Sequence, residues 1–259
     1  MLFDNKMRTR SVTFVKFALC ALAAVILLSC GAGAAECTHA GALGTSRQLK
    51  IKADVTAGLG RGFPALGLAP GEVILTFDDG PMPDTTPRIL DILAHECIQA
   101  TFFMIGKRAE AHPDIVARVR AAGHSIGSHS YSHRNLAKLP YEEAAADIQK
   151  GYEAVEKAEF GSNANRPRLF RFPDYKSTPE LAAFVRSRHG TITDVNMSPA
   201  DWRGQPADIT MQRVKMLFDR QGRGILGLHD SQKNTVELLP MIIADMKARN
   251  MHIVHMTAE

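Results

Sequence analysis

Short apolar runs alternate along the chain with longer segments in which apolar residues recur at helical spacing. Seven of the short runs are rich in β-branched or aromatic residues and predict strands. They cover residues 73–77, 100–104, 124–127, 169–172, 191–196, 224–229 and 252–256. Repeated alternation of strand and helix is typical of a parallel sheet with helices outside it. Seven or eight such units over about 190 residues favour an α/β fold closed into a single-domain (β/α) barrel over an open sheet.

The predicted helices also begin and end at suitable residues. Three of them start with proline behind a residue that can cap, namely Thr86-Pro87, His112-Pro113 and Thr178-Pro179. Gly123 and Gly190 stand where two helices are expected to end. These signals support the boundaries of the elements and carry no information about function.

The N-terminal segment has a basic stretch, an apolar run over residues 17–28 and then small residues. These three regions are typical of a secretory signal peptide, and the run is shorter than the about 20 residues of a transmembrane helix. We therefore expect a signal peptide over residues 1–35, an irregular lead-in over 36–70 and an exported domain over 71–259, with no transmembrane span in the mature chain. The alternative is cleavage before Cys30, which would place a lipid anchor on that cysteine and hold the domain at a membrane surface.

Composition narrows the class of protein further. At 259 residues, with 45% hydrophobic and 22% charged residues, the chain is an ordinary globular protein, which excludes disorder and a multi-span membrane protein. Three of its four net positive charges lie in the first 35 residues. A remainder so close to neutral gives no reason to expect a nucleic-acid partner.

Two of the four cysteines remain in the mature chain under either interpretation of the N-terminus, namely Cys37 and Cys97. Export permits a disulfide between them. The alternative is a pair of free thiols, with Cys97 as a small buried residue near the start of a strand. Because the protein is expected to be exported, we expect the disulfide between Cys37 and Cys97 rather than two free thiols.

Polar residues cluster just after the predicted strands, where parallel α/β barrels place their active sites. Asp78 and Asp79 follow the first strong strand, in the sequence Thr-Phe-Asp-Asp-Gly-Pro. Such a pair can be an ordinary polar turn, since Asp-Gly is a common turn former. It can also divide two tasks, because neighbouring acids in a turn point in different directions. One carboxylate can then bind a metal while the other moves a proton.

His129 and His133 follow the third predicted strand. Their spacing predicts that both imidazoles lie on one side of a helical turn, within reach of one ion. With one carboxylate of the Asp78-Asp79 pair they make a three-ligand site that leaves a position open. Such a site is typical of catalytic zinc, and the same ligands also occur in non-heme iron oxygenases. His124, at the start of the strand, is expected to be structural.

Three further strand ends carry candidate residues. Arg171 ends the fourth strand, where it can cover the barrel rim or pair with a catalytic carboxylate and keep it ionised. Asp201 and Trp202 follow the fifth strand, and His229 ends the sixth. A histidine supported by an aspartate suits a general acid, whereas alone it would be an ordinary core histidine. Polar clusters at five strand ends favour an active site.

In these motifs the sequence resembles the NodB-homology polysaccharide deacetylases, carbohydrate esterase family 4. The resemblance covers residues 71–256, and the motifs Thr-Phe-Asp-Asp-Gly-Pro, His-Ser-x-x-His, Arg-Phe-Pro, Asp-Trp and Leu-Gly-Leu-His occur in the family's order. It implies a distorted (β/α) barrel and a zinc-dependent hydrolase that removes N-acetyl groups from a glycan containing N-acetylglucosamine. Chitooligosaccharide and peptidoglycan are the expected substrates, and cobalt or nickel can replace zinc in such a site.

The resemblance also implies a role for each site residue. The metal ligands would be Asp79, His129 and His133. Asp78 would be the general base, kept charged by Arg171, and His229 the general acid, its charged form favoured by Asp201. The reaction implied is metal-assisted hydrolysis of the N-acetyl amide.

The expected substrate contacts follow the same resemblance. The backbone N–H after Pro173 would stabilise the oxyanion, and Trp202 and Leu228 would form apolar walls around the acetyl methyl group. The family often has tyrosine directly after this proline, whereas here Asp174 comes first and Tyr175 second. We expect both residues at the substrate and an altered substrate preference.

Two other interpretations of the function stay open. One is a catalytically silent carbohydrate-binding protein on the same fold, although no base, ligand or acid is missing from the motifs. The other is an O-deacetylase that acts on acetylated xylan. In each case the expected partner is an acetylated carbohydrate, and the protein is expected to be a monomer.

Overall fold

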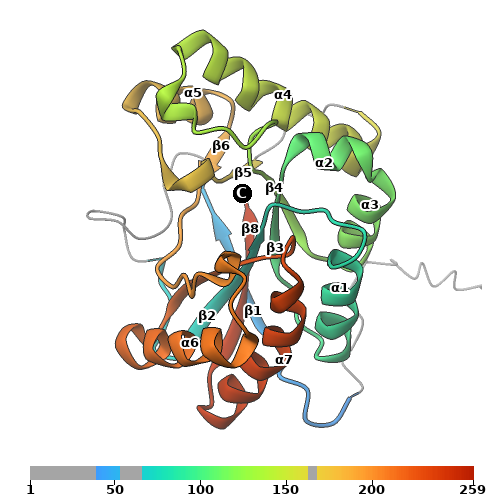
Figure 1. Cartoon of the computed structure of the whole chain (residues 1–259), viewed down its shortest axis with the longest axis vertical. Helices are drawn as coiled ribbons and strands as arrows, with labels where there is room; N and C mark the ends of the chain where they lie inside the picture. The colour runs from blue at the N-terminus through green and yellow to red at the C-terminus, as the bar shows by residue number, and fades with distance from the viewer. Residues whose placement is uncertain (1–38, 53–65, 163–167) are drawn as a thin grey trace, which may run out of the picture. The chain divides into compact units, whose positions relative to one another are not determined.

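Parallel strands form a closed ring at the centre of the structure, and the helices surround it (Figure 1). The computed structural model describes residues 39–52, 66–162 and 168–259. Within these residues every strand pair is parallel, in the order β1-β8-β2-β3-β4-β5-β6, with β7 paired to β2. The α/β barrel predicted from the sequence is confirmed.

The strands are β1 (Thr45–Ile51), β2 (Glu72–Asp78), β3 (Thr101–Met104), β4 (Ser125–Ser128), β5 (Arg168–Phe170), β6 (Gly190–Ile192), β7 (Gly224–His229) and β8 (His252–Ala258). The helices are α1 (Thr86–His95), α2 (Gly106–Ala111), α3 (Pro113–Ala121), α4 (Tyr141–Phe160), α5 (Pro179–Ser187), α6 (Ala207–Gln221) and α7 (Lys233–Ala248). The described residues also form the short 3-10 helices η1 (Leu136–Lys138), η2 (Pro173–Tyr175) and η3 (Asp201–Arg203). All seven predicted strands are present within a few residues of their expected ends.

The ring closes through the segment that follows β6. Met197 in this segment forms an isolated parallel bridge to Leu226 of β7, and β7 pairs with β2 along residues 73–78. A continuous path therefore runs from β2 through β3, β4, β5 and β6 to β7 and back to β2. Because β6 itself has only three residues, the barrel is irregular on this side.

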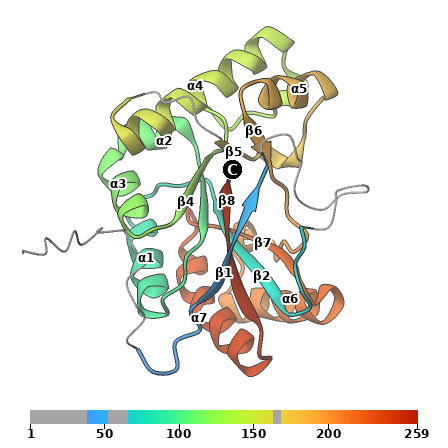
Figure 2. The ribbon, with the colours of Figure 1, turned by 180° about the vertical axis from the view of Figure 1, so that it is seen from behind.

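β8 and β1 lie against the inner face of this ring, and Figure 2 shows the two strands side by side. β8 pairs with β2 only at Glu72 and Val73 and pairs with β1 over most of its length. Ile51 of β1 and Val254 of β8 pack in one cluster with inward residues of the ring such as Phe103. The prediction of an irregular lead-in over 36–70 was therefore wrong for residues 45–51, which form a strand.

β2 is buried on both faces, as expected for a parallel strand between two layers. Val73 and Phe77 pack against the helix layer, whereas Ile74 belongs to the inner cluster. The alternation places Thr76 and Asp78 on the inner face as well. The last inward residue of β2 is therefore an acid at the mouth of the barrel.

Some of the residues expected to begin or end helices have other roles in the structure. Thr178 caps α5, because its side chain accepts a hydrogen bond from the N–H of Leu181 at 3.3 Å. Thr86 lies inside α1, and neither this helix nor α3 has a side-chain cap. Gly190 begins β6 rather than ending a helix, and the left-handed residue after α5 is His189, with φ 57°.

Several N-terminal predictions lie outside the described residues. The signal peptide, Cys30 and Cys37 all belong to residues 1–38, and these expectations remain predictions. Cys97 is disulfide-bonded, and its partner also lies outside the described residues. No helix of the described part of the chain is long and apolar enough to cross a membrane.

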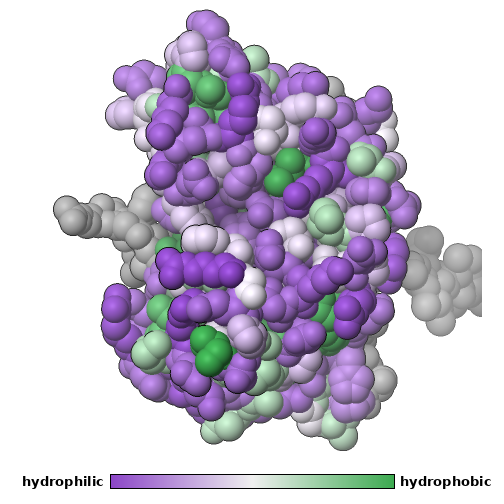
Figure 3. Space-filling view, viewed as in Figure 1, coloured by the Kyte–Doolittle hydropathy of each residue, from purple (hydrophilic) through white to green (hydrophobic). Residues whose placement is uncertain are grey.

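The face of the molecule that is turned to the viewer in Figure 1 is mostly hydrophilic. Figure 3 shows polar side chains over nearly all of this face, with apolar ones in small separate patches. Among the large apolar side chains that remain exposed are Trp202 and Met216. This face offers no broad apolar area for a protein partner.

Two buried histidines lie below the mouth of the barrel. The N–H of Ala100 donates to His124 Nδ1 at 3.1 Å, and His255 Nε2 is 2.9 Å from Ser125 Oγ. Burial lowers the pKa of each imidazole to about 4. Both side chains are therefore neutral in the folded protein, and His124 has the structural role predicted for it.

This pair predicts a loss of stability in mild acid. Unfolded histidines with a pKa near 6.5 take up protons that the folded ones do not accept, so the melting temperature is expected to fall as the pH falls from 6.5 to 4. The double variant His124→Asn/His255→Gln keeps the polar atoms and removes the titration. The melting temperature of the variant should then fall less steeply with pH in this window than that of the original protein. An unchanged slope would contradict the assignment.

Candidate active site

Asp78 and Arg171 form a buried ion pair at the mouth of the barrel. Arg171 Nη1 lies 2.6 Å from Asp78 Oδ1 and 2.9 Å from Thr76 Oγ1, and both charged side chains are almost fully buried. The guanidinium also lies 4.0 Å above the ring of Phe103. Burial alone would raise the pKa of Asp78, but Arg171, with His129 and His229, lowers it below its ordinary value. Asp78 is therefore a carboxylate that stays ionised.

A strained turn brings Tyr175 to the same carboxylate. Asp174 and Tyr175 in η2 have φ 55° and 57°, which is the left-handed region that residues with a side chain seldom adopt. The Tyr175 hydroxyl lies 3.4 Å from Asp78 Oδ2. Burial and the adjacent Asp78 raise the pKa of the phenol, so it stays protonated and can donate to the carboxylate.

Asp79, His129 and His133 converge on one point. Asp79 Oδ1 lies 3.2 Å from His133 Nε2 and 3.7 Å from His129 Nε2, and the ligand atoms of all three residues lie within 4.8 Å of one another. His129 Nδ1 donates to the carbonyl of Arg171 at 2.8 Å, which leaves Nε2 free to bind a cation.

The residues in this cluster fit a metal ion. Asp79 Oδ1 is buried and has no hydrogen-bond partner, which is costly unless a cation or donor satisfies it. Burial lowers the pKa of His129 in spite of the nearby Asp78 and Asp79, so its neutral form, the one that binds metals, is favoured. Two imidazole nitrogens and one carboxylate oxygen are a ligand set typical of catalytic zinc.

The histidines lie on a loop, not on the predicted helical turn. Ser130 and His133 have φ 64° and 58°, and the chain from 129 to 133 contains no helix. Helix α4 holds this loop, because Asp147 accepts hydrogen bonds from the N–H of Tyr131 at 2.9 Å and of Ser132 at 3.2 Å. An added Cβ at Gly151 would lie 2.5 Å from the Ser130 carbonyl carbon, so only glycine allows this approach.

His229 and Asp201 form a second buried pair. Asp201 Oδ1 accepts from His229 Nδ1 at 2.8 Å, and Oδ2 accepts from the His229 N–H and from Thr235 Oγ1, both at 2.7 Å. Burial would lower the pKa of His229, but Asp201, with Asp78 and Asp79, raises it to about 9. The imidazole is thus fixed in orientation and held in its protonated form at neutral pH.

Asp230 supports the Asp79 turn from beneath. It is fully buried, and its Oδ2 accepts a hydrogen bond from Thr86 Oγ1 at 2.6 Å. A Cβ added at Gly80 would lie 1.9 Å from the same oxygen, so the turn rests directly on this carboxyl group. Burial raises the pKa of Asp230 to about 7. The sequence alone indicates no role for Asp230, although this residue directly follows His229 in the motif.

The structure brings most of the predicted site residues together, with two exceptions. Trp202 lies on η3 beside Asp201 and is 53% exposed, so it belongs to the rim. Leu228 is wholly buried and packs in the core with the helix layer. It pairs in register with Phe77, which faces the helices, whereas its neighbour His229 pairs with Asp78 on the inner face. The prediction that Leu228 forms a wall of the acetyl site was therefore wrong.

Comparison with known proteins agrees with this site. The profile of the polysaccharide deacetylase family matches residues 67–190. A peptidoglycan-N-acetylglucosamine deacetylase of Bacillus cereus is 32% identical over 187 residues, which are 71% of this chain and 66% of the relative. A chitooligosaccharide deacetylase of Azorhizobium caulinodans is 30% identical over 164 residues, 61% of this chain and 73% of the relative. A solved peptidoglycan deacetylase structure from Bdellovibrio bacteriovorus has a TM-score of 0.72 at 33% identity, over 83% of this chain and 59% of its own.

The fold and the site together define an α/β barrel with a candidate metal centre. The chain belongs to the polysaccharide deacetylase family, and the resemblance inferred from its motifs is confirmed. Members of this family that act on glycans are metal-dependent deacetylases. The chain spans just under two thirds of the length of the Bacillus relative.

The buried ion pair predicts a specific pattern of stability. Replacing Arg171 by Met leaves Asp78 buried without its partner, which is expected to lower the free energy of unfolding by about 3–5 kcal/mol at pH 7. The deficit should shrink as the pH falls, because the unpaired carboxyl then takes up a proton. Adding Asp78→Asn to this variant should restore part of the lost free energy of unfolding, as measured by urea denaturation. Equal stability of the single and double variants would contradict the assignment.

Proposed function

We propose that this protein is a zinc-dependent deacetylase that hydrolyses the N-acetyl group of N-acetylglucosamine units in an oligo- or polysaccharide. The observation that carries the proposal is the juxtaposition of an ionised carboxylate, a three-ligand metal cluster and a protonated histidine at one barrel mouth. The similarity to peptidoglycan and chitooligosaccharide deacetylases supports the choice of substrate. The same similarity, with the predicted signal peptide, supports export.

Asp79, His129 and His133 would hold the metal ion. When bound there, zinc supplies a Lewis acid that polarises the acetyl carbonyl and makes a water molecule more acidic. The buried Asp79 Oδ1, which lacks a hydrogen-bond donor, supports its role as a ligand. Zinc is preferred to iron in this proposal because hydrolysis needs no change of oxidation state, while cobalt and nickel could serve in its place.

Asp78 is assigned as the general base. Its Oδ1 is engaged by Arg171 at 2.6 Å, whereas Oδ2 has only the long contact to the Tyr175 hydroxyl, at 3.4 Å. Oδ2 is therefore the oxygen that takes a proton from the attacking water. The Arg171 ion pair keeps the base ionised, and the Asp174 N–H is assigned to the developing oxyanion.

His229 is assigned as the general acid. Asp201 accepts its Nδ1–H, so Nε2 carries the proton that is transferred to the leaving amine. Among the wall residues proposed earlier, Trp202 is retained at the rim, where its exposed ring can pack against a sugar. The xylan O-deacetylase and the silent binding protein are the alternatives that the experiments below exclude or support.

Acetate release is the direct test. The purified protein, loaded with zinc or stripped with a chelator, is assayed on N-acetylglucosamine oligomers, peptidoglycan and acetylated xylan. We expect zinc-dependent release from the first two and none from xylan. No release from any of them, by a folded protein shown to bind zinc, would contradict the proposal and favour the binding protein.

Substitution of a proposed ligand separates metal binding from folding. His133→Ala is expected to lower zinc affinity and acetate release by at least about 100-fold, because only two ligands remain. His189→Ala, an exposed histidine after α5, serves as the matched control and is expected to change neither quantity. Zinc affinity is measured by competition with a chromophoric chelator, and a His133→Ala protein with unaltered affinity would remove this residue from the site.

The Asp201–His229 pair predicts the basic limb of the pH profile. If protonated His229 is the acid, the rate falls as the pH rises through its raised pKa. Asp201→Asn removes the charge that raises this pKa, so the basic limb of log kcat/KM should move to lower pH by about 1–3 units. A profile with an unmoved basic limb would assign the acid to another group.

A further inference from the structure

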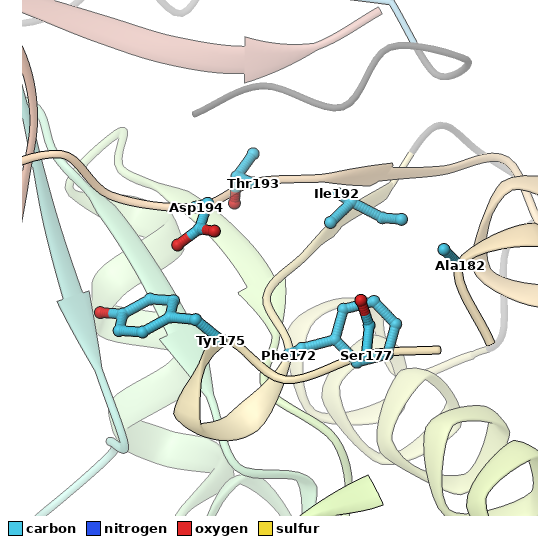
Figure 4. Close-up of a pocket in the computed structure, with 7 residues that line it drawn as sticks. All are labelled: Phe172, Tyr175, Ser177, Ala182, Ile192, Thr193 and Asp194. Carbon is cyan, nitrogen blue, oxygen red and sulfur yellow. The ribbon is translucent and has the colours of Figure 1, made fainter. Parts of the chain in front are cut away.

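A pocket of about 190 Å³ lies beside Tyr175, whose hydroxyl contacts Asp78. Figure 4 shows that residues on η2 and after it face residues of β6 and the segment that follows. Phe172, Tyr175 and Ile192 give it apolar walls, and Ser177 and Asp194 give it polar groups. A volume of this size holds one sugar ring and not a longer piece of glycan.

The pocket and the candidate active site share a wall. Tyr175 lines the pocket with its ring, and its hydroxyl lies 3.4 Å from Asp78 Oδ2. The main-chain carbonyl of Asp194 accepts a hydrogen bond from Arg171 Nη2 at 3.5 Å. A glycan whose reacting sugar lies at Asp78 would therefore place an adjacent sugar at this pocket.

Glycine at position 227 permits this arrangement. Gly227 pairs with Thr76 in the register of β2 and β7, so it lies on the inner face of the barrel. A Cβ added there would lie 2.6 Å from Val195 Cγ1 and 3.4 Å from the Tyr175 hydroxyl oxygen. The absence of a side chain leaves room for Tyr175 and Val195, which in turn fixes the Tyr175 wall of the pocket.

Asp194 determines the charge of the pocket. Its Oδ1 accepts a hydrogen bond from the Val195 N–H at 2.8 Å. In the described part of the chain, no lysine, arginine or histidine forms an ion pair with this carboxylate. Burial raises its pKa, while the Val195 N–H and Arg171 limit the rise. Arg171 is itself engaged by Asp78, and Lys176 is exposed and does not line the pocket.

We propose that this pocket binds the uncharged sugar next to the reacting N-acetylglucosamine and that Asp194 makes it reject a sugar that carries a carboxylate. The inference rests on the proposed deacetylase function and narrows its substrate class. Aromatic rings pack against the apolar face of a pyranose, and a carboxylate accepts hydrogen bonds from its hydroxyl groups. The lactyl carboxylate of N-acetylmuramic acid would instead meet a like charge in a half-buried site. The preferred substrate is thus a chitooligosaccharide, not the alternating glycan of peptidoglycan.

Two glycans of equal length separate these substrate classes. The zinc-loaded protein is assayed on the pentamer of N-acetylglucosamine and on an oligomer in which N-acetylglucosamine and N-acetylmuramic acid alternate. We expect kcat/KM to be at least about tenfold higher on the neutral pentamer. Asp194→Asn keeps the acceptor for the Val195 N–H and removes the charge. It should reduce this ratio about tenfold, because kcat/KM rises on the muramic-acid glycan, whereas the weaker hydrogen bonds of an amide oxygen can only lower kcat/KM on the pentamer.

Glu180→Gln is the matched control. Glu180 is an exposed acid in the first turn of α5, close to Ser177 in sequence but absent from the pocket lining, and its loss should leave the ratio unchanged. An equal change for both glycans in Asp194→Asn, or the same shift in Glu180→Gln, would overturn the inference.

A binding measurement separates this inference from the proposed function. Calorimetric titration of the metal-stripped protein with the two glycans does not depend on catalysis. Tighter binding of the neutral pentamer, with the difference reduced by Asp194→Asn, would support the pocket assignment even in a protein that releases no acetate. Equal binding of the two glycans by the original protein and the variant would overturn it, whatever the outcome of the acetate assay.

Discussion

The guanidinium of Arg171 is fully buried, and a buried charge is stable only when the protein supplies its partners. Those partners are the carboxylate of Asp78, the hydroxyl of Thr76 and the main-chain carbonyls of residues 193 and 194. Its own carbonyl accepts the Nδ1–H of His129. Arg171, which directly follows β5, therefore connects β2, the loop that carries His129 and His133, and the segment after β6. The geometry of the candidate base and of one metal ligand therefore depends on this single residue, through its guanidinium and its main-chain carbonyl. The same guanidinium also contacts the segment that carries Asp194.

The loops around Arg171 are strained in a way that isolated turns would not tolerate. Left-handed φ angles occur at Asp79, Ser130, His133 and Asp174, all of them residues with a side chain. Each costs free energy and persists because neighbouring groups determine the backbone. Asp147 accepts hydrogen bonds from two N–H groups of the loop between His129 and His133. Asp230 packs under the Asp79 turn. The outer helix α4 and the residue after β7 thus hold the polar atoms in a fixed, convergent arrangement.

The sequence predicted the barrel and the site residues that depend on short motifs. Its errors have physical reasons. β1 has alternating polar residues, and its strand conformation comes from pairing with β8, which local pattern does not encode. Leu228 was placed in the site although its neighbour His229 faces inward, and alternation along a strand then requires that Leu228 face outward. Asp147 and Asp194 could not be recognised from the sequence as residues near the site. Their contacts form only when α4 and the segment after β6 approach the mouth of the barrel.

The pairing of β1 with β8 has a consequence for the order of folding. The hydroxyl of Ser46 donates to the carbonyl of Ile253, a contact between residues 207 positions apart. The two strands pack against the inner face of the ring, so the interior cannot be filled until the final strand has been synthesised. A contact between residues so far apart in the sequence closes a long loop, and folds rich in such contacts form slowly. Until β8 joins β1, the inward apolar side chains of the ring, Ile74 and Phe103 among them, have no inner layer to cover them.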